Sequence, residues 1–64
     1  MNKLIEEMRL KNLTRNKVSA TTGLSKPTVR KYLKKPELFP VKSARVINNL
    51  LNVEDEYGFK ELFK

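Results

Sequence analysis

The sequence predicts a small all-α domain built from four or five short helices. Two features of its 64 residues support this prediction, and a third excludes other classes of protein. Apolar residues recur at helical spacings in several short segments. Thr14 and Ser25, which favour helix starts, and Gly23, which favours a helix end, divide the first half of the chain. Cysteine and histidine are absent, so the chain has no residues for a disulfide framework, a classical zinc finger or imidazole catalysis.

The first two helices are expected over residues 2–12 and 15–22. Leu4, Ile5 and Met8 place one apolar stripe on the first helix. Before the second helix, the hydroxyl of a threonine can accept a hydrogen bond from an amide of the first turn. After it, glycine can adopt a left-handed conformation without a steric penalty and end the helix.

The third helix is expected to start after Ser25 and to continue through residue 35. Pro27 lies in its first turn, where the missing N–H costs no helical hydrogen bond. Val29, Tyr32 and Leu33 lie on one face of this helix, so we expect that face to point into the core.

The next part of the chain predicts an irregular loop and a fourth helix. Residues 36–40 begin and end with proline, which leaves no room for regular structure, and Leu38 or Phe39 is expected to pack beneath them. A fourth helix is expected over residues 41–52. Its apolar stripe is Val46, Ile47, Leu50 and Leu51.

Residues 54–63 are compatible with a helix or a strand. Tyr57, Phe59 and Glu61 alternate with Gly58 and Lys60, as they would in a strand. We favour a fifth helix, because the three acidic residues at 54–56 suit the positive end of a helix dipole.

Positive charge is concentrated in the first half of the chain. The whole sequence has 14 lysines and arginines against 7 acidic residues, a net charge of +7. Residues 1–35 contain ten bases and two acids, whereas residues 54–64 contain four acids and two bases. This segregation predicts that the first half faces a polyanion and that the C-terminal segment has another role.

Residues 15–33 carry the most informative motif, R-N-K-V-S-A-T-T-G-L-S-K-P-T-V-R-K-Y-L. It predicts two short helices that are joined by a tight turn and cross at a steep angle. Val18, Val29 and Tyr32 are expected to meet between them, and Ser19 is small where the second helix passes close. The motif resembles the helix-turn-helix of phage repressors and Cro proteins, the lambda-repressor-like or XRE class.

The resemblance covers nearly the whole chain, since N-L-T at 12–14, L-N-V at 51–53 and E-L-F at 61–63 also fit that layout. It implies one lambda-repressor-like domain over residues 1–64, with the helix-turn-helix at about 15–34. It also implies a sequence-specific transcriptional regulator that binds double-stranded DNA in the major groove. Such a protein would act in the cytoplasm or nucleoid of a bacterial host by occupying a palindromic operator.

The resemblance also assigns DNA-binding residues. The base-reading candidates are Ser25, Lys26, Pro27, Thr28, Arg30 and Lys31. The phosphate candidates are Arg15, Asn16, Lys17, Lys34, Lys35, Lys42 and Ser43. Lysine and arginine can bind guanine O6 and N7, so Arg30, Lys31 and Lys26 are the candidates for direct readout. Pro27 stands where the family often has an amide and has no side-chain donor, so the family's base preferences do not carry over.

A contact surface this small binds best as a homodimer on half-sites about one helical turn apart. The candidate interface lies in residues 54–64, at Tyr57, Phe59, Leu62 and Phe63. Alternatively, these side chains complete the core of the monomer. No cofactor or metal is expected, because calcium-loop spacing and glycine-rich phosphate loops are absent from the sequence.

Two other functions stay open at this point. An excisionase-like accessory protein would bend DNA, and an antitoxin-like module would use its positive face to bind an acidic protein. An enzyme is not expected, because no nucleophile, base and oxyanion pattern is present. A membrane partner is not expected either, since the longest apolar run is two residues.

Overall fold

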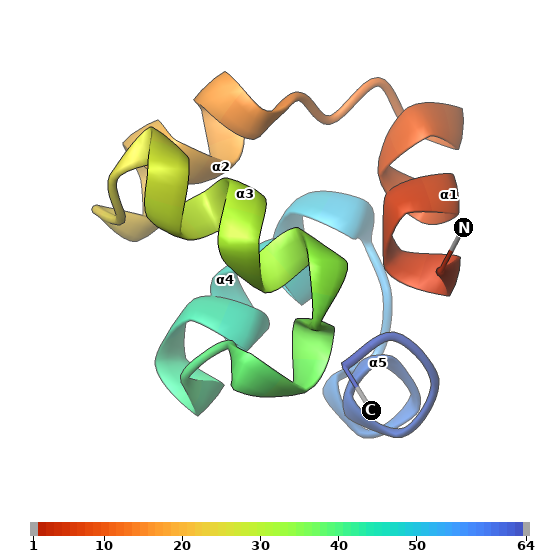
Figure 1. The fold of residues 1–64 in the computed structure, drawn as a ribbon. Coiled ribbons are helices and arrows are strands. Elements are labelled where there is room, and N and C mark those ends of the chain that lie inside the picture. Colours follow the sequence, from red (N-terminus) through yellow and green to blue (C-terminus); the bar gives the residue numbers. More distant parts are fainter. Residues whose placement is uncertain (1, 64) are drawn as a thin grey trace.

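A computed structural model describes residues 2–63, which form five α-helices, one 3-10 turn and no strand (Figure 1). The helices are α1 (Lys3–Leu10), α2 (Arg15–Thr22), α3 (Lys26–Lys34), α4 (Val41–Leu51) and α5 (Asp55–Glu61), and the 3-10 turn is η1 (Pro36–Leu38). The all-α prediction is confirmed, and so is the choice of a helix over a strand for the C-terminal segment. None of the helices in residues 2–63 has the length and apolar character needed to cross a bilayer.

Capping side chains account for the starts of the first three helices. Asn2, Thr14 and Ser25 each accept a hydrogen bond from the amide three residues further on, at 2.8, 3.2 and 3.4 Å. Each bond satisfies an amide that has no partner inside its helix. Thr14 and Ser25 therefore act as the sequence predicts, and Asn2 is a third cap that the sequence analysis did not identify.

Left-handed residues end α1, α2 and α4. Gly23 has φ of 78°, as predicted for the end of α2. Asn12 and Asn52 have φ of 57° and 62° and act in the same way after α1 and α4. Asparagine tolerates this conformation better than most residues, because its short polar side chain can bond locally. The predicted ends at residues 12 and 52 therefore lie slightly too late.

The segment between α3 and α4 is not irregular, so that prediction is wrong. The N–H of Leu38 donates to the carbonyl oxygen of Lys35 at 2.9 Å, and the N–H of Phe39 donates to that of Pro36 at 3.1 Å. A proline has the backbone angle that such a short 3-10 turn needs at its first position. Phe39 is buried beneath this turn, whereas Leu38 is 44% exposed.

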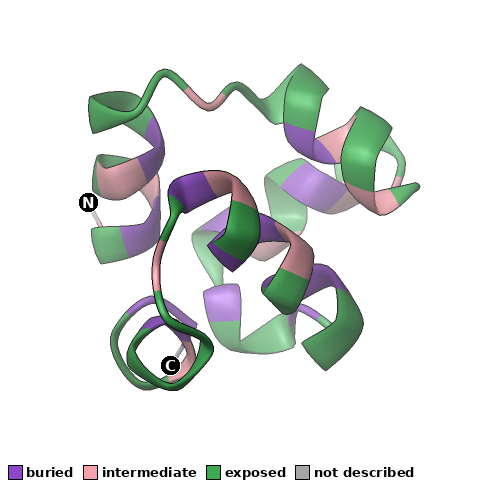
Figure 2. Ribbon diagram, turned by 180° about the vertical axis from the view of Figure 1, so that it is seen from behind, coloured by how far each residue is buried: buried purple, intermediate pink, exposed green. Residues whose placement is uncertain are grey.

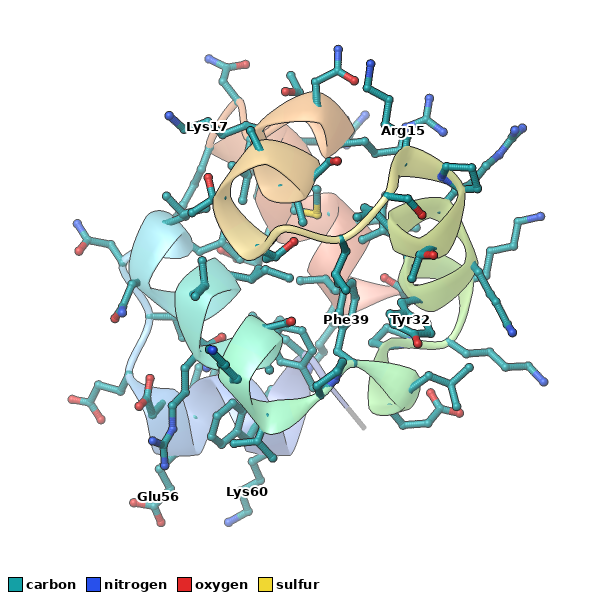
Figure 3. The ribbon with its side chains drawn as sticks, turned by 90° about the vertical axis from the view of Figure 1, so that its left-hand side faces the viewer. Arg15, Lys17, Tyr32, Phe39, Glu56 and Lys60 are labelled. Atoms are coloured by element: carbon teal, nitrogen blue, oxygen red, sulfur yellow. The ribbon has the colours of Figure 1, made fainter. Side chains whose placement is uncertain are left out.

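One apolar cluster fills the centre of the molecule. Figure 2 shows that the buried positions lie on the inward sides of the helices. The cluster consists of Leu4, Met8, Val18, Val29, Leu33, Phe39, Ala44, Ile47, Leu51, Leu62 and Phe63. Phe39 packs in a T-shaped arrangement with both Tyr32 and Phe63, with ring centroids 5.2 and 5.7 Å apart. Tyr32 is only half-buried and packs against the cluster from one side (Figure 3).

The inward face of α4 is rotated away from the predicted stripe. Ile47 and Leu51 are buried as predicted, but Val46 and Leu50 are half-buried. Small and polar residues complete the inward face instead, because they lie three or four residues from Ile47 and Leu51. These residues are Ser43, Ala44 and Asn48.

Helix α5 packs closely on α4 where Gly58 meets Asn48. A Cβ atom on Gly58 would overlap the side-chain amide of Asn48, which is fully buried. The Asn48 Nδ2 group donates to the carbonyl oxygen of Asp55 at 3.5 Å, and its Oδ1 atom has no hydrogen-bond partner within the described residues. The close approach of the two helices therefore depends on the absence of a side chain at position 58.

Candidate nucleic-acid interface

A concave basic surface, here called the basic cleft, is formed by the start of α2, the outer side of α3 and η1. Its volume is about 790 Å³. Six of its nine lining residues are lysine or arginine, and none is acidic. The lining residues are Arg15, Asn16, Lys26, Pro27, Arg30, Lys31, Lys34, Lys35 and Leu38.

Contacts between α2, α3 and the turn that joins them hold α3 in place beside α2. Val18 on α2 and Val29 on α3 are both fully buried. Between the two helices, the Ser19 hydroxyl donates to the carbonyl oxygen of Leu24 at 2.6 Å, which ties α2 to the turn. Because one side of α3 is packed in this way, its cations lie on the opposite side and point into solvent. Figure 3 shows nitrogen-tipped side chains extending outward from α3.

The cations of the basic cleft form no ion pair within residues 2–63. Three ion pairs occur elsewhere in that part of the chain. They are Lys3–Glu61 at 2.9 Å, Lys11–Glu7 at 3.5 Å and Arg45–Asp55 at 3.8 Å. In the first pair, the Glu61 carboxylate accepts a hydrogen bond from Lys3 and raises the pKa of that lysine. Three of the seven acidic residues thus pair with cations outside the cleft, and no cation of the cleft has an acidic partner within residues 2–63.

The structure brings eight of the predicted DNA-binding residues together on the basic cleft. They are Arg15, Asn16, Lys26, Pro27, Arg30, Lys31, Lys34 and Lys35. Lys17 and Lys42 are exposed but do not line it. Figure 3 shows Arg15 and Lys17 on opposite sides of α2, as expected for residues two apart on a helix. Ser25 and Thr28 also lie outside the cleft lining, and the Ser25 hydroxyl donates to Thr28 Oγ1 at 2.8 Å.

Ser43, a predicted phosphate ligand, lies outside the basic cleft. Its residue surface is only 7% exposed, and it lies on the inward face of α4. Ser43 precedes the buried Ile47 by one helical turn, so the packing of Ile47 turns Ser43 inward as well. Ser43 therefore presents little surface to a phosphate, in contrast to the exposed candidates.

Leu38 is a cleft residue that the sequence analysis missed. It was expected, as an alternative to Phe39, to lie beneath the loop. The larger aromatic ring takes that buried place, and Leu38 is left on the surface where it lines the basic cleft. No signal in the sequence separates these two neighbours, because both are large and apolar.

Burial divides the four residues of the predicted dimer interface. Leu62 and Phe63 belong to the core of the single chain, at 3% and 8% exposure, so they offer a partner little surface. Phe59 is half-buried and packs against Phe63 with ring centroids 6.2 Å apart. Tyr57 is 54% exposed. The alternative interpretation, completion of the monomer core, therefore holds for Leu62 and Phe63.

Comparison of the chain with protein-family models, curated proteins and solved structures found no significant match. Within residues 2–63, no three acidic, histidine or cysteine side chains are grouped in a way that could hold a metal ion. The geometry of the basic cleft is therefore the main observation from which a function can be argued.

Proposed function

We propose that this protein is a sequence-specific regulator of transcription that binds double-stranded DNA, in the manner of Cro proteins and phage repressors. The observation that carries the proposal is the basic cleft. It presents six unpaired cations and no acidic residue along one helix and its neighbours. A surface of this kind attracts polyanions.

The dimensions of α3 suit the major groove. A nine-residue helix is about 13 Å long and has a diameter of about 10–12 Å, and the B-DNA major groove is about 12 Å wide. In this arrangement Arg30, Lys31 and Lys26 reach the base edges. Each good bidentate contact to guanine contributes about 1–3 kcal/mol of discrimination.

Cleft residues from outside the centre of α3 would fix the orientation of the helix on the DNA. Arg15 and Asn16 lie in the first turn of α2, where unpaired amides and the helix dipole add positive potential. Lys34 and Lys35 lie at the other end of α3. Phosphate contacts at both ends would hold α3 in register without reading sequence themselves.

The protein would act as a homodimer on a palindromic operator and exclude competing proteins by occupancy. Tyr57 is the exposed aromatic residue that remains available for a dimer contact on α5. Tyr57→Ala removes this side chain and is expected to weaken dimerisation without unfolding the chain. Sedimentation measures the change in dimerisation.

Selection of bound duplexes from a random pool tests the proposal. We expect an enriched palindrome and a loss of affinity of about a hundredfold in the double variant Arg30→Ala with Lys31→Ala. The double variant Arg45→Ala with Lys60→Ala removes the same charge outside the basic cleft and should change affinity far less. Unchanged affinity after the Arg30 and Lys31 substitutions contradicts the major-groove proposal. Strong bending without an enriched palindrome contradicts it too, and instead supports an architectural protein.

A further inference from the structure

A second cleft, here called the α1–α3 cleft, lies beside the basic cleft and has a different character. Its volume is about 570 Å³. Its apolar lining comes from α1, α3 and the α1–α2 linker. Ile5 and Leu13 are half-buried there, and Met8 and Leu33, which belong to the core, are more deeply buried beside them. Its cations are Arg9, Arg15, Arg30 and Lys34. An apolar surface with four cations and no acidic residue is complementary to a partner that is both apolar and acidic.

We propose that the α1–α3 cleft binds an acidic amphipathic helix of a partner protein and that this partner excludes DNA. The proposal rests on the proposed DNA-binding function, because exclusion has meaning only if the basic cleft binds DNA. It adds a second binding site and a means of regulating the first.

The spacing of the cleft residues favours a helical partner. Arg30 and Lys34 are four residues apart on α3, so their side chains lie about one turn, or 6 Å, apart along one face. Ile5 and Met8 are three residues apart on α1 and face the same cleft. A partner helix with apolar residues at i, i+3 and i+7 and flanking glutamates matches both rows. This is the general mode in which a helix lies in a groove.

Other occupants fit these observations less well. DNA phosphates gain nothing from the apolar lining of Ile5, Met8 and Leu13. A second copy of the chain carries acidic residues at 54–56. Leu62 and Phe63 of the same segment are buried in its own core, so the segment presents no apolar row that matches the lining of this cleft.

Three cations belong to both clefts, which explains why the two ligands would compete. Arg15, Arg30 and Lys34 line the basic cleft and the α1–α3 cleft alike. A carboxylate that pairs with them removes the charge available to DNA phosphates and bases. In contrast, Arg9 lines only the α1–α3 cleft and Lys26 lines only the basic cleft. These two exposed residues allow the two sites to be tested separately.

The probe is a labelled synthetic peptide of about 15 residues, with leucines at i, i+3 and i+7 and glutamates on both flanks. Fluorescence anisotropy measures its binding to the full chain. A peptide of the same composition in shuffled order tests whether the amphipathic pattern matters. We expect the patterned peptide to bind at least tenfold more tightly than the shuffled one, and to displace a bound duplex.

Arg9→Ala should weaken the patterned peptide about fivefold and leave the duplex affinity unchanged. Lys26→Ala should do the reverse, and Arg30→Ala should weaken both ligands. Circular dichroism checks that each variant remains folded, which is expected because all three side chains are exposed.

Equal binding of the patterned and shuffled peptides overturns the proposal, since attraction to the net charge would then account for it. Peptide binding that Arg9→Ala does not weaken overturns it too. Self-association that Arg9→Glu abolishes, without peptide binding, overturns it and assigns the cleft to a second copy. If the peptide binds as expected but no duplex does, the proposed DNA-binding function fails while the peptide site stands.

Discussion

The polar groups on the outer side of α3 and those at the contact between α4 and α5 have opposite surroundings. The cations on the outer side of α3 are exposed and form no ion pair within residues 2–63. At α5, Asp55 pairs with Arg45 and Glu61 pairs with Lys3, and the Asn48 amide is buried beneath Gly58. Polar groups of the C-terminal region therefore take part in holding the chain together, whereas those on α3 remain available for a partner outside it.

This difference separates two kinds of substitution. Changes on α3 remove charge from a solvated face, so they should alter binding and leave stability nearly unchanged. Changes at the α4–α5 contact alter packing in the interior, so they should lower stability and leave the charge of the basic cleft unchanged. The following predictions test this separation, from the largest expected effect to the smallest.

The largest effect is expected from salt on duplex binding. If a bound dimer neutralises about five to eight phosphates, its affinity falls by about a thousandfold between about 50 and 200 mM salt. A plot of log affinity against log salt concentration measures the slope. Lys34→Ala should make the slope shallower by about one for each subunit that loses a contact. An affinity that does not depend on salt contradicts the assignment of the basic cleft to DNA.

The next largest effect is expected from Gly58→Ala at the α4–α5 contact. The added Cβ would overlap the Asn48 amide, which is fully buried. We expect the free energy of unfolding to fall by about 2 kcal/mol, as urea denaturation measures it. Adding Asn48→Ala should recover part of this loss, because it removes the overlapping group. If the losses of unfolding free energy in the two single variants simply add in the double variant, the two residues do not act through one contact.

A smaller effect is expected from Gly23→Ala at the turn before α3. The added Cβ would meet no atom within 4 Å, so any cost arises from the left-handed backbone, which has φ of 78°. We expect a loss of about 1 kcal/mol in unfolding free energy. Gly23→Asn is the matched control and should cost less, because asparagine adopts this conformation at Asn12 and Asn52. Equal losses for alanine and asparagine would point to a cause other than the backbone angle.

The smallest effect is expected from Lys3→Ala, which removes the ion pair between α1 and α5. Both partners are partly solvated, so the loss of stability should be smaller than for Gly23→Ala. The pKa of Lys3 is raised in the folded chain. The ion pair therefore stabilises the folded chain fully when the pH is below 10.5, the ordinary pKa of lysine, and this stabilisation is lost as the pH rises through the raised pKa.

Thermal unfolding at neutral and strongly alkaline pH should show the difference between Lys3→Ala and the natural chain shrinking as the pH rises. Lys60→Ala removes a cation from α5 that has no ion pair within residues 2–63, and so serves as the control. A difference that grows with pH would contradict this sign.

The helix boundaries that could be predicted from sequence are those set by neighbours in the chain. Thr14, Ser25 and Gly23 act through bonds and backbone angles within about three residues, so their effect is visible in a short window. The bounds of α2 agree with the prediction for this reason. The helix ends at Asn12 and Asn52 also depend only on neighbouring residues. Asparagine occurs inside helices as well, however, so it is a weaker signal for a helix end than glycine.

The residues of the candidate site could be predicted only in part. The positive charge of α3 follows from its lysines and arginine. The outward direction of these side chains follows from Val29 and Leu33, which lie one turn apart on the opposite side. The burial of Ser43 and Asn48 could not be inferred in this way, because polar residues are usually exposed. Their burial depends on which side of α4 meets α5 and the rest of the core.

The sequence by itself determined the all-α class, the two short helices α2 and α3 and the concentration of positive charge in the first half, because composition and short-range spacing are enough for these features. Only the tertiary structure decided that Arg15 of α2 joins the cations of α3 in one cleft, that Arg9 stands apart from it, and that Phe39 rather than Leu38 fills the core. These outcomes depend on contacts between segments distant in the chain, where packing chooses among side chains that local spacing leaves equivalent.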